Sequence, residues 1–277
     1  MRIVHVCLVG GYTEGAWGLC QTESDYINPY GVHIMRLPFA FPVPYNINRQ
    51  VGIFKGFYKV LEELKPETIF VHNIQFQDIR KVAAYKRKHP EVTVYVDNHS
   101  DFSICARNWF SRNTLYRFWW KPCAKAMEPY ADKFWGVMPS RVDFLHNVFG
   151  ISRDKIDMLV MGADDESVVR AANPELQRII REKYGVSQDD FLIVTGGKID
   201  AFKTQTLLLA KAVQEINREN VKLLIFGSID ENLKDGILSL CDGTKIQHVG
   251  WAKGDQPYEY FACADLVAFP GRHSVYW

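Results

Sequence analysis

The segment from Gly196 to Thr204 carries residue types that can hold a phosphorylated ligand. Gly196 and Gly197 come directly before Lys198, and Lys203 lies five positions further along. The segment stands between a short apolar run and a stretch of helical period, so both ammonium groups could face a diphosphate over a helix N-terminus. The order does not fit a Walker A loop, because no glycine directly precedes Lys203. The alternative is a solvated loop with two surface lysines. The position of the segment at the carboxyl end of a predicted parallel strand favours ligand contact.

A second glycine-rich segment follows the apolar run at the N-terminus. Its glycines are Gly10, Gly11, Gly15 and Gly18. Backbone amides in such a loop can approach a phosphate or a sugar. The spacing is not a GxGxxG fingerprint, and any tight turn between a strand and a helix also requires glycine. Ligand binding and plain turn geometry therefore both stay open.

The polar segment at residues 97–101 follows another predicted strand. His99 is the candidate catalytic residue, because an imidazole can act on an acceptor or hold a sugar hydroxyl, and Asp101 is the candidate for a further sugar contact. On this motif alone a hydrogen-bonded structural histidine is favoured. His99, Asp101 and the distant His72 suggest a metal, but no further ligand spacing supports one, so we predict no metal site.

Short β-branched apolar runs alternate with longer segments of helical period, which predicts an α/β fold. The runs are mostly apolar, as expected for parallel strands covered on both faces in doubly wound sheets. The predicted strands are Ile3–Val9, Val32–Leu37, Thr68–His72, Val92–Val96, Lys133–Val137, Ile156–Val160, Phe191–Thr195, Leu223–Phe226, Ile246–Val249 and Leu266–Phe269. The predicted helices are Arg49–Leu64, Pro174–Tyr184, Thr204–Asn217, Glu231–Leu240 and Pro257–Cys263.

The chain of 277 residues suits two α/β domains. The segment Met161–Asn173 has several acids and no long apolar run, so we place the linker there. The predicted domains are residues 1–164 and 165–277. The second has only four predicted strands and no closing helix, so we expect it to be incomplete.

Composition excludes several classes of function. Hydrophobic residues make up 47% and the formal net charge is +1, which fits a globular protein without a general field for nucleic acid. The six cysteines are scattered without metal-ligand spacing, which fits a reduced, cytoplasmic setting. No window approaches the roughly 20 apolar residues that a membrane span requires.

Residues 107–125 combine five basic residues with six aromatics and no acid. This mixture is typical of a helix at a membrane interface, with Trp109, Trp119 and Trp120 at the headgroups and Arg117 on anionic lipid. Nucleic acid is disfavoured in a near-neutral chain. The alternative is a helix whose aromatics fill the core of the first domain, and both interpretations stay open.

Taken in order, the motifs resemble the pattern of glycosyltransferase family 4 on the GT-B fold. The matching segments are Gly10–Gly18, Asp97–Asp101, Met161–Asp164, Gly197–Lys198 with Lys203, Leu224–Gly227, Val249–Trp251 and Ala264–Pro270. The resemblance covers nearly the whole chain. It implies two Rossmann-like domains facing a cleft, with the acceptor on the first domain and a nucleotide sugar on the second.

The resemblance also implies an activity: transfer of a sugar from a nucleotide-diphosphate donor to a glycan or lipid-linked acceptor, with retention of configuration and without a cofactor or metal. Gly197, Lys198 and Lys203 match the residues that bind the donor diphosphate. Lys198 stands where arginine is usual and lacks its bidentate fork, so donor affinity could differ. His99 and Gly11 fall on the acceptor side.

One departure concerns the end of the chain. Family members place two glutamates shortly after the segment matched by Phe269-Pro270, and the sequence stops at Trp277 before presenting them. We therefore expect residues 1–277 alone to be inactive. A non-catalytic nucleotide- or sugar-binding remnant and a GT-B sugar-nucleotide epimerase are the alternatives. The sequence fits a cytoplasmic enzyme, peripheral at the inner membrane face.

Overall fold

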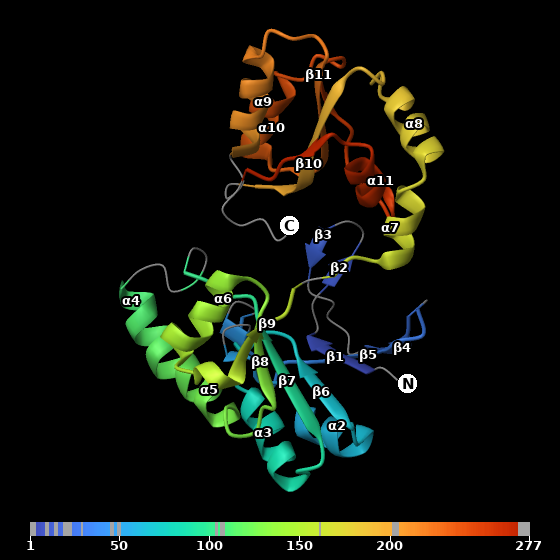
Figure 1. Ribbon diagram of the computed structural model, residues 1–277. Coiled ribbons are helices and arrows are strands. Elements are labelled where there is room, and N and C mark those ends of the chain that lie inside the picture. Colours follow the sequence, from blue (N-terminus) through green and yellow to red (C-terminus); the bar gives the residue numbers. More distant parts are fainter. Residues whose placement is uncertain are drawn as a thin grey trace. The chain divides into compact units, whose positions relative to one another are not determined.

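A computed structural model describes residues 4–8, 11–13, 16–18, 24–28, 30–44, 47–48, 51–102, 105, 109–160, 162–200 and 205–270. The chain divides into two compact units, residues 1–161 and 162–277. Each unit contains parallel strands joined by helices (Figure 1), so the predicted α/β class is confirmed.

The described residues of the first unit form three sheets. Their orders are β1-β5-β4, β2-β3 and β6-β7-β8-β9. The strands are β1 (Val4–Leu8), β2 (Gly11–Thr13), β3 (Ala16–Gly18), β4 (Ser24–Ile27), β5 (His33–Leu37), β6 (Thr68–Val71), β7 (Thr93–Asn98), β8 (Lys133–Gly136) and β9 (Ile156–Met158). The helices are α2 (Phe57–Leu64), α3 (Ile79–Lys88), α4 (Trp109–Ser111), α5 (Lys121–Met127), α6 (Pro139–Phe144), the π-helices η1 (Arg112–Trp120) and η2 (Leu145–Phe149), and the short 3₁₀ helix η3 (Arg153–Lys155).

The N-terminal part departs from the predicted parallel scheme. Strands β2 and β3 form an antiparallel hairpin in which Gly11 pairs with Gly18, where a turn into a helix was expected. Strand β4 is antiparallel to β5 and shields its edge. Helix α2 begins only at Phe57, because Gly52 and Gly56 have φ values of +61° and +75°, which interrupt a right-handed helix.

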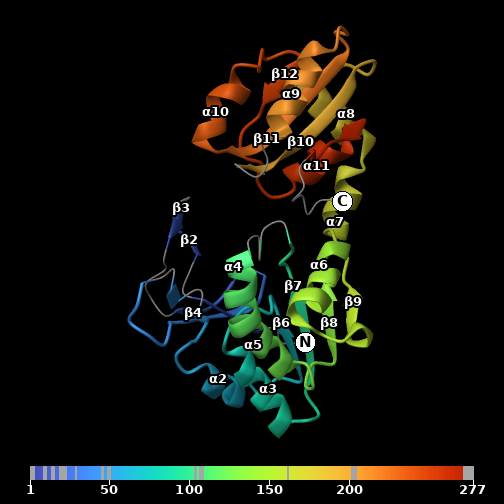
Figure 2. The same cartoon turned by 90° about the vertical axis from the view of Figure 1, so that its left-hand side faces the viewer.

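The four-stranded sheet of the first unit carries its helices on one face. Its strands follow one another in chain order, and right-handed crossovers that all advance in one direction place every helix on the same side. Figure 2 shows α3 and α5 in front of these strands. The core on this side includes Val94, Val96 and Phe134 from the sheet and Met127 from α5.

The opposite face of this sheet is aromatic and partly exposed. The ring of Trp135 stacks on Tyr95 and Phe70, with centroids 4.7 and 5.9 Å apart, and Phe70 is 48% exposed. Within the described residues, this face of the sheet is therefore less covered than the face that carries the helices. Chain-order strands supply no return crossover to cover the second face.

The second unit forms one sheet in the order β12-β11-β10-β13, with all strand pairs parallel. Its strands are β10 (Phe191–Ile199), β11 (Val221–Ile229), β12 (Ile246–His248) and β13 (Leu266–Val267). Its helices are α7 (Asp165–Ala171), α8 (Pro174–Lys183), α9 (Gln205–Glu215), α10 (Glu231–Leu238) and α11 (Gln256–Ala262).

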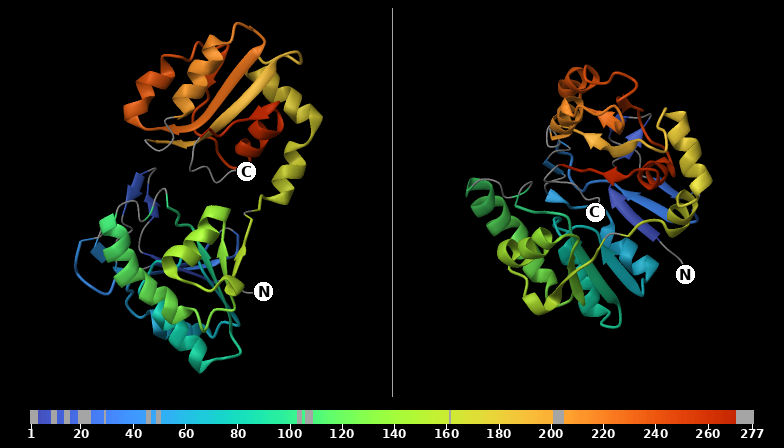
Figure 3. Two further views of the ribbon diagram at one scale, coloured as in Figure 1. Left: turned by 60° about the vertical axis from the view of Figure 1, so that its left-hand side comes forward. Right: turned by 45° about the horizontal axis from the view of Figure 1, so that its top comes forward.

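Helices cover both faces of this second sheet (Figure 3, left). Leu192 and Val194 of β10 pack with Ile180 of α8 on one side, whereas Ile193 packs with Val213 of α9 on the other. The chain advances through β10, β11 and β12 and then returns past β10 to β13, and this reversal puts α11 on the opposite face from α9 and α10. Doubly wound packing is thus confirmed here.

Two predicted boundaries in the second unit differ from the structure. Strands β10 and β11 each continue to nine residues, so the segment predicted as a glycine and lysine loop is partly strand. The expected linker contains helix α7, because Asp164 caps it by accepting a hydrogen bond from the Ser167 N–H.

Candidate functional site

Three glycines stand at the carboxyl ends of three neighbouring strands in the second unit. Gly197 of β10 is in register with Gly227 of β11, and Gly250 follows β12. Their φ values are +97°, +105° and +78°, a conformation that favours glycine. The Gly227 N–H donates to the Gly250 carbonyl at 2.6 Å, so the three positions form one glycine row along the sheet edge.

Close backbone approach explains why Gly227 and the neighbouring Gly196 carry no side chain. A Cβ at Gly227 would lie 1.9 Å from the Gly197 oxygen, and a Cβ at Gly196 would lie 2.5 Å from the Phe226 oxygen. His248 fixes this arrangement by donating from Nε2 to the Gly227 carbonyl at 3.0 Å. Because Gly196 and Gly227 have no side chains, a ligand that lies over this edge can approach the backbone closely.

The glycine row lies beside the point where the strand order reverses. From β10 the chain first adds β11 and β12 on one side, and later adds β13 on the other. In open α/β sheets, ligands bind outside the carboxyl ends of strands at such a switch point. Gly196, Gly197 and Lys198 lie in the last part of β10 at this position, which is where a ligand is expected.

The predicted donor residues are only partly covered by the structure. Lys198 is part of strand β10, its side chain is 72% exposed, and its Nζ lies 3.9 Å from the Asp200 carboxylate. Lys203, Gly10 and Gly15 lie outside the described residues. The diphosphate contact of both lysines, and the ligand contact of Gly11 and Gly18 in their hairpin, stay predictions.

In the first unit, three polar side chains meet at the carboxyl ends of β6 and β7. His72 Nδ1 and His99 Nε2 lie 2.8 and 3.1 Å from Oδ2 of Asp97, and the two imidazole centroids are 4.4 Å apart. The backbone N–H of Asn73 donates to the other oxygen of Asp97 at 2.6 Å. Asn73 has φ +73°, a left-handed conformation that asparagine tolerates.

Hydrogen bonds set the charge state of this histidine–aspartate cluster. Burial alone would raise the pKa of Asp97, but the bonds from His72, His99 and the Asn73 N–H outweigh it and hold the pKa well below its ordinary value. The same bond to Asp97 raises the pKa of His72, against the lowering effect of partial burial. Asp97 is therefore a carboxylate that orients both imidazoles.

The loop that carries His99 is held on both sides. Asn98 is fully buried, and its amide donates to the carbonyls of Ser100 and Arg141 at 2.9 and 3.0 Å. The Ser100 hydroxyl donates to Gln75, whose amide donates to the Tyr116 hydroxyl, at 2.7 and 2.8 Å. These bonds tie the loop to α6, η1 and the exit from β6, so His99 is positioned on a rigid support.

Asp101 lies in a buried ion pair instead of facing solvent. Its Oδ2 is 3.6 Å from Nε of Arg141, and both residues are about 5% exposed. Two nitrogens of Arg141, Nε and Nη1, are buried without a hydrogen-bond partner. The sugar contact of Asp101 stays a prediction, and the structure gives this carboxylate a role in compensating the charge of Arg141.

The sequence interpretation missed the central member of the cluster. It grouped His99 with Asp101 and a distant His72, whereas Asp97 is the residue that lies between the two histidines. One ligand atom from each of His72, Asp97 and His99 lies within 4.8 Å of the others, a grouping that can hold a metal ion. The available signal was that both histidines follow neighbouring parallel strands, whose carboxyl ends share one edge.

The basic aromatic stretch is divided between core and surface. Trp120 is 2% exposed and packs in the core of the first unit, which removes it from the predicted lipid contacts. Trp109 is 79% exposed and Phe118 71%, and Trp119 is also exposed. No described helix is both long and apolar enough to cross a membrane.

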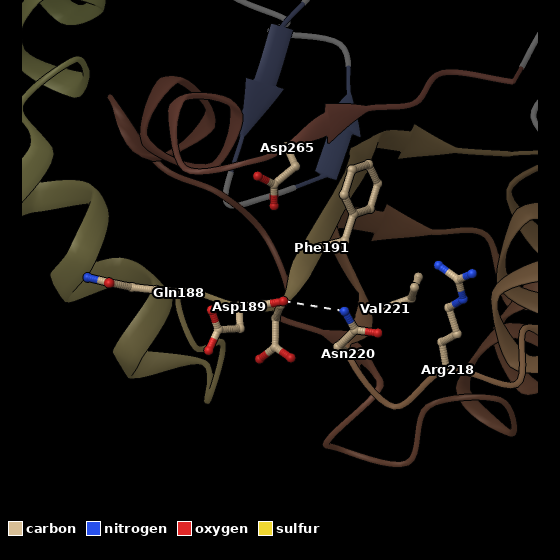
Figure 4. A pocket seen from close by; sticks show the side chains of 8 residues that line it. Gln188, Asp189, Phe191, Arg218, Asn220, Val221 and Asp265 are labelled. Carbon is tan, nitrogen blue, oxygen red and sulfur yellow. Dashed lines mark hydrogen bonds between the residues drawn. The ribbon is translucent and has the colours of Figure 1, made fainter.

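A polar hollow of about 530 Å³ lies at the opposite, amino-terminal ends of β10 and β11 (Figure 4). Two of its carboxylates have structural partners: Asp190 accepts from the Ser187 N–H at 2.7 Å, and Asp265 accepts from the Leu192 N–H at 2.7 Å and from Arg181. Ligands of parallel sheets bind at the other edge. We assign this hollow no binding function.

Comparison with known proteins supports a glycosyltransferase resemblance. No protein-family model matches the chain. An uncharacterized glycosyltransferase of Methanocaldococcus jannaschii is 26% identical over 134 residues, which are 47% of this chain and 33% of that protein.

Solved structures extend the likeness to nearly the whole chain. HepE of Anabaena, in complex with UDP, matches 98% of this chain and 74% of its own, with a TM-score of 0.61 and 13% identity. A glycosyltransferase of Rickettsia africae matches 87% and 60%, with a TM-score of 0.58 and 15% identity. WaaG, a glycosyltransferase involved in lipopolysaccharide biosynthesis, matches 90% and 64%, with a TM-score of 0.54 and 14% identity.

The chain therefore covers a third of the curated relative and 60% of the Rickettsia structure. Identities this low support an inference about the fold alone. That fold is α/β with the Rossmann-like units of GT-B glycosyltransferases, and the chain resembles these enzymes.

Proposed function

We propose that the chain is part of a retaining glycosyltransferase that takes a sugar from a nucleotide-diphosphate donor, as the resemblance to family 4 implies. The observation that carries the proposal is the glycine row at the switch point of the second unit. It offers a ligand the close backbone approach that a nucleotide diphosphate requires. HepE of Anabaena, which has the same fold, was solved with UDP and with UDP-glucose.

The proposed chemistry depends on charge at the diphosphate. Breaking the bond between sugar and phosphate leaves negative charge on the leaving group, and Lys198 and Lys203 would stabilise it as it grows. His99, oriented by Asp97, would hold or activate a hydroxyl of a glycan or lipid-linked acceptor on the first unit. The hydrogen bond between His99 and Asp97 supports this role, because it fixes the orientation of the imidazole.

Nucleotide binding tests the donor assignment. Calorimetry with a panel of nucleoside diphosphates should show that Lys203→Ala weakens binding more than any other single lysine change, followed by Lys198→Ala. Lys234→Ala is the matched control, because this lysine pairs with Glu231 on α10. Unchanged affinity in Lys203→Ala and Lys198→Ala would contradict the assignment.

We also propose that the first unit associates with an anionic membrane through the exposed part of the aromatic stretch. Trp109, Phe110, Phe118 and Trp119 are exposed, and residues 102–127 contain no Asp or Glu. Exposed aromatics prefer the headgroup region, and Arg117 adds attraction to anionic lipid. A lipid-linked acceptor would be reached from this surface.

Vesicle sedimentation tests the membrane proposal. Vesicles with anionic lipid should sediment the protein, and high salt should release it because surface charge is screened. A double change of Trp109→Ala and Phe118→Ala should abolish sedimentation, whereas Trp251→Ala, an exposed tryptophan of the second unit, should not. Equal sedimentation of all variants would contradict a specific surface.

A further inference from the structure

We propose that His72, Asp97 and His99 form a binding site for a divalent first-row transition metal ion, with Zn²⁺ as the best-fitting probe. Two imidazoles and one carboxylate are side chains that such ions prefer. The ion would take Nδ1 of His72, Nε2 of His99 and an oxygen of Asp97, the atoms that already converge. The inference is independent of sugar transfer, because metal binding is measured directly.

The spacing of these atoms is close to that of a coordination sphere. Bonds of about 2.0 Å in a tetrahedral zinc site separate neighbouring ligand atoms by about 3.3 Å. Both histidine nitrogens lie 2.8 to 3.1 Å from Oδ2 of Asp97, and no two ligand atoms are more than 4.8 Å apart. Adjustments of about an ångström, within the range of side-chain rotation, would therefore admit the ion.

The carboxylate is held in place for this role. The Asn73 N–H donates to Oδ1 of Asp97 at 2.6 Å, which leaves Oδ2 directed at the two imidazoles. Such hydrogen bonds behind a ligand orient it and strengthen metal binding. Asp97 is nearly fully buried at the site. Its negative charge would offset part of the positive charge of an incoming cation.

Access to the site comes from the side of His72. The His72 side chain is 70% exposed, His99 is 28% exposed, and Asp97 forms the buried floor. An ion can therefore enter from solvent, and three protein ligands leave a fourth position for water or another oxygen ligand. This pattern of three ligands with one open position is that of exchangeable rather than closed structural sites.

A hydrogen-bonded cluster without metal explains the same distances, so the experiment must separate the two. Metal-stripped protein is titrated with Zn²⁺ by calorimetry and with Co²⁺ by visible absorption. We expect one equivalent to bind, and His72→Ala and His99→Ala each to weaken binding at least tenfold. Co²⁺ bound by two histidines and a carboxylate should give visible bands that both variants lose.

His33→Ala is the matched control. His33 also pairs with a carboxylate, Asp25, in the same unit, and neither residue belongs to the cluster. Its loss should leave Zn²⁺ affinity and the Co²⁺ spectrum unchanged. Circular dichroism of each variant verifies folding, and a wild-type protein that binds no more tightly than His72→Ala would overturn the proposal.

Discussion

The two units use the same sheet edge in different ways. In the second unit, the carboxyl ends of β10, β11 and β12 present a row of glycines without side chains. In the first unit, the carboxyl ends of β6 and β7 present His72, Asp97 and His99. One edge offers backbone groups that suit a diphosphate, whereas the other offers titratable side chains that suit proton transfer or metal binding.

The packing behind these edges differs as well. Reversal of the strand order covers the second sheet with helices on both faces, whereas in the described part of the first unit the helices pack on one face of the chain-order strands. Strand order therefore influences which strands are covered on both faces. We therefore expect a substitution inside the second sheet to lower the free energy of unfolding much more than a substitution on the aromatic face of the first sheet.

The largest effect is expected from Gly227→Ala. The new Cβ would lie 1.9 Å from the Gly197 oxygen, at a φ of +105° that side chains rarely adopt, and neither backbone segment can move without breaking the β10–β11 pairing. We expect the substitution to lower the free energy of unfolding by at least about 3 kcal/mol. Urea unfolding, with hydrogen exchange of the β10 and β11 amides, would assign this loss to the second unit.

Gly243→Ala is the control for conformation without crowding. Gly243 has φ +76°, but a Cβ there would meet no atom within 4 Å. Its substitution should cost about 1 kcal/mol from backbone strain alone. Equal effects of the two substitutions would show that the glycine row is not closely packed and that its edge does not require glycine.

A pair of substitutions measures the difference in coverage. Leu224 of β11 is 1% exposed, so Leu224→Ala should cost about 3 kcal/mol through lost burial and a cavity. Phe70→Thr on the aromatic face should cost less than about 1 kcal/mol, because the ring is already half exposed and threonine suits a strand. Both values follow from the midpoints of urea unfolding, provided that the unfolding free energy of each variant has the same dependence on urea concentration. A cost of Phe70→Thr close to that of Leu224→Ala would contradict one-sided coverage.

The sequence predicted the buried strands well and the edges poorly. Runs such as Lys133–Val137 and Leu223–Phe226 were identified because parallel strands are short and apolar, and they correspond to β8 and β11. The glycine hairpin at β2 and β3 was missed, because glycine serves turns, hairpins and ligand loops alike. One-sided coverage was missed because it follows from strand order, which no local pattern encodes.

The candidate sites show the same limit. Gly197 was identified from its position after an apolar run, and the strand that contains it was placed correctly although it extends further. Asp97 was overlooked, since its partner His72 is 25 residues away and only the pairing of β6 with β7 brings them together. Long-range pairing of this kind cannot be read from a single segment.

A small effect is expected from Asp242→Asn, which tests whether the negative charge of a carboxylate away from the two functional edges stabilises the fold. Asp242 lies before β12, and its Oδ1 accepts hydrogen bonds from the N–H groups of Thr244, Lys245 and Ile246 at 2.8, 2.7 and 3.1 Å. Although partial burial would raise it, these bonds lower the pKa of Asp242 to about 2 from an ordinary 3.8. This carboxylate therefore resembles Asp97 in charge state but is bound only within its own turn.

Because the folded pKa of Asp242 is lowered, its ionised form stabilises the fold above its ordinary pKa, and this contribution disappears as pH falls through about 2. At pH 7 the asparagine variant should be less stable by about 1 kcal/mol, since a neutral acceptor binds the same N–H groups less strongly and the site is largely solvated. Thermal unfolding of both proteins between pH 7 and pH 2 should show the difference shrinking toward zero at the acid end. A difference that stayed constant with pH would mean that shape, and not the charge of Asp242, holds the turn before β12.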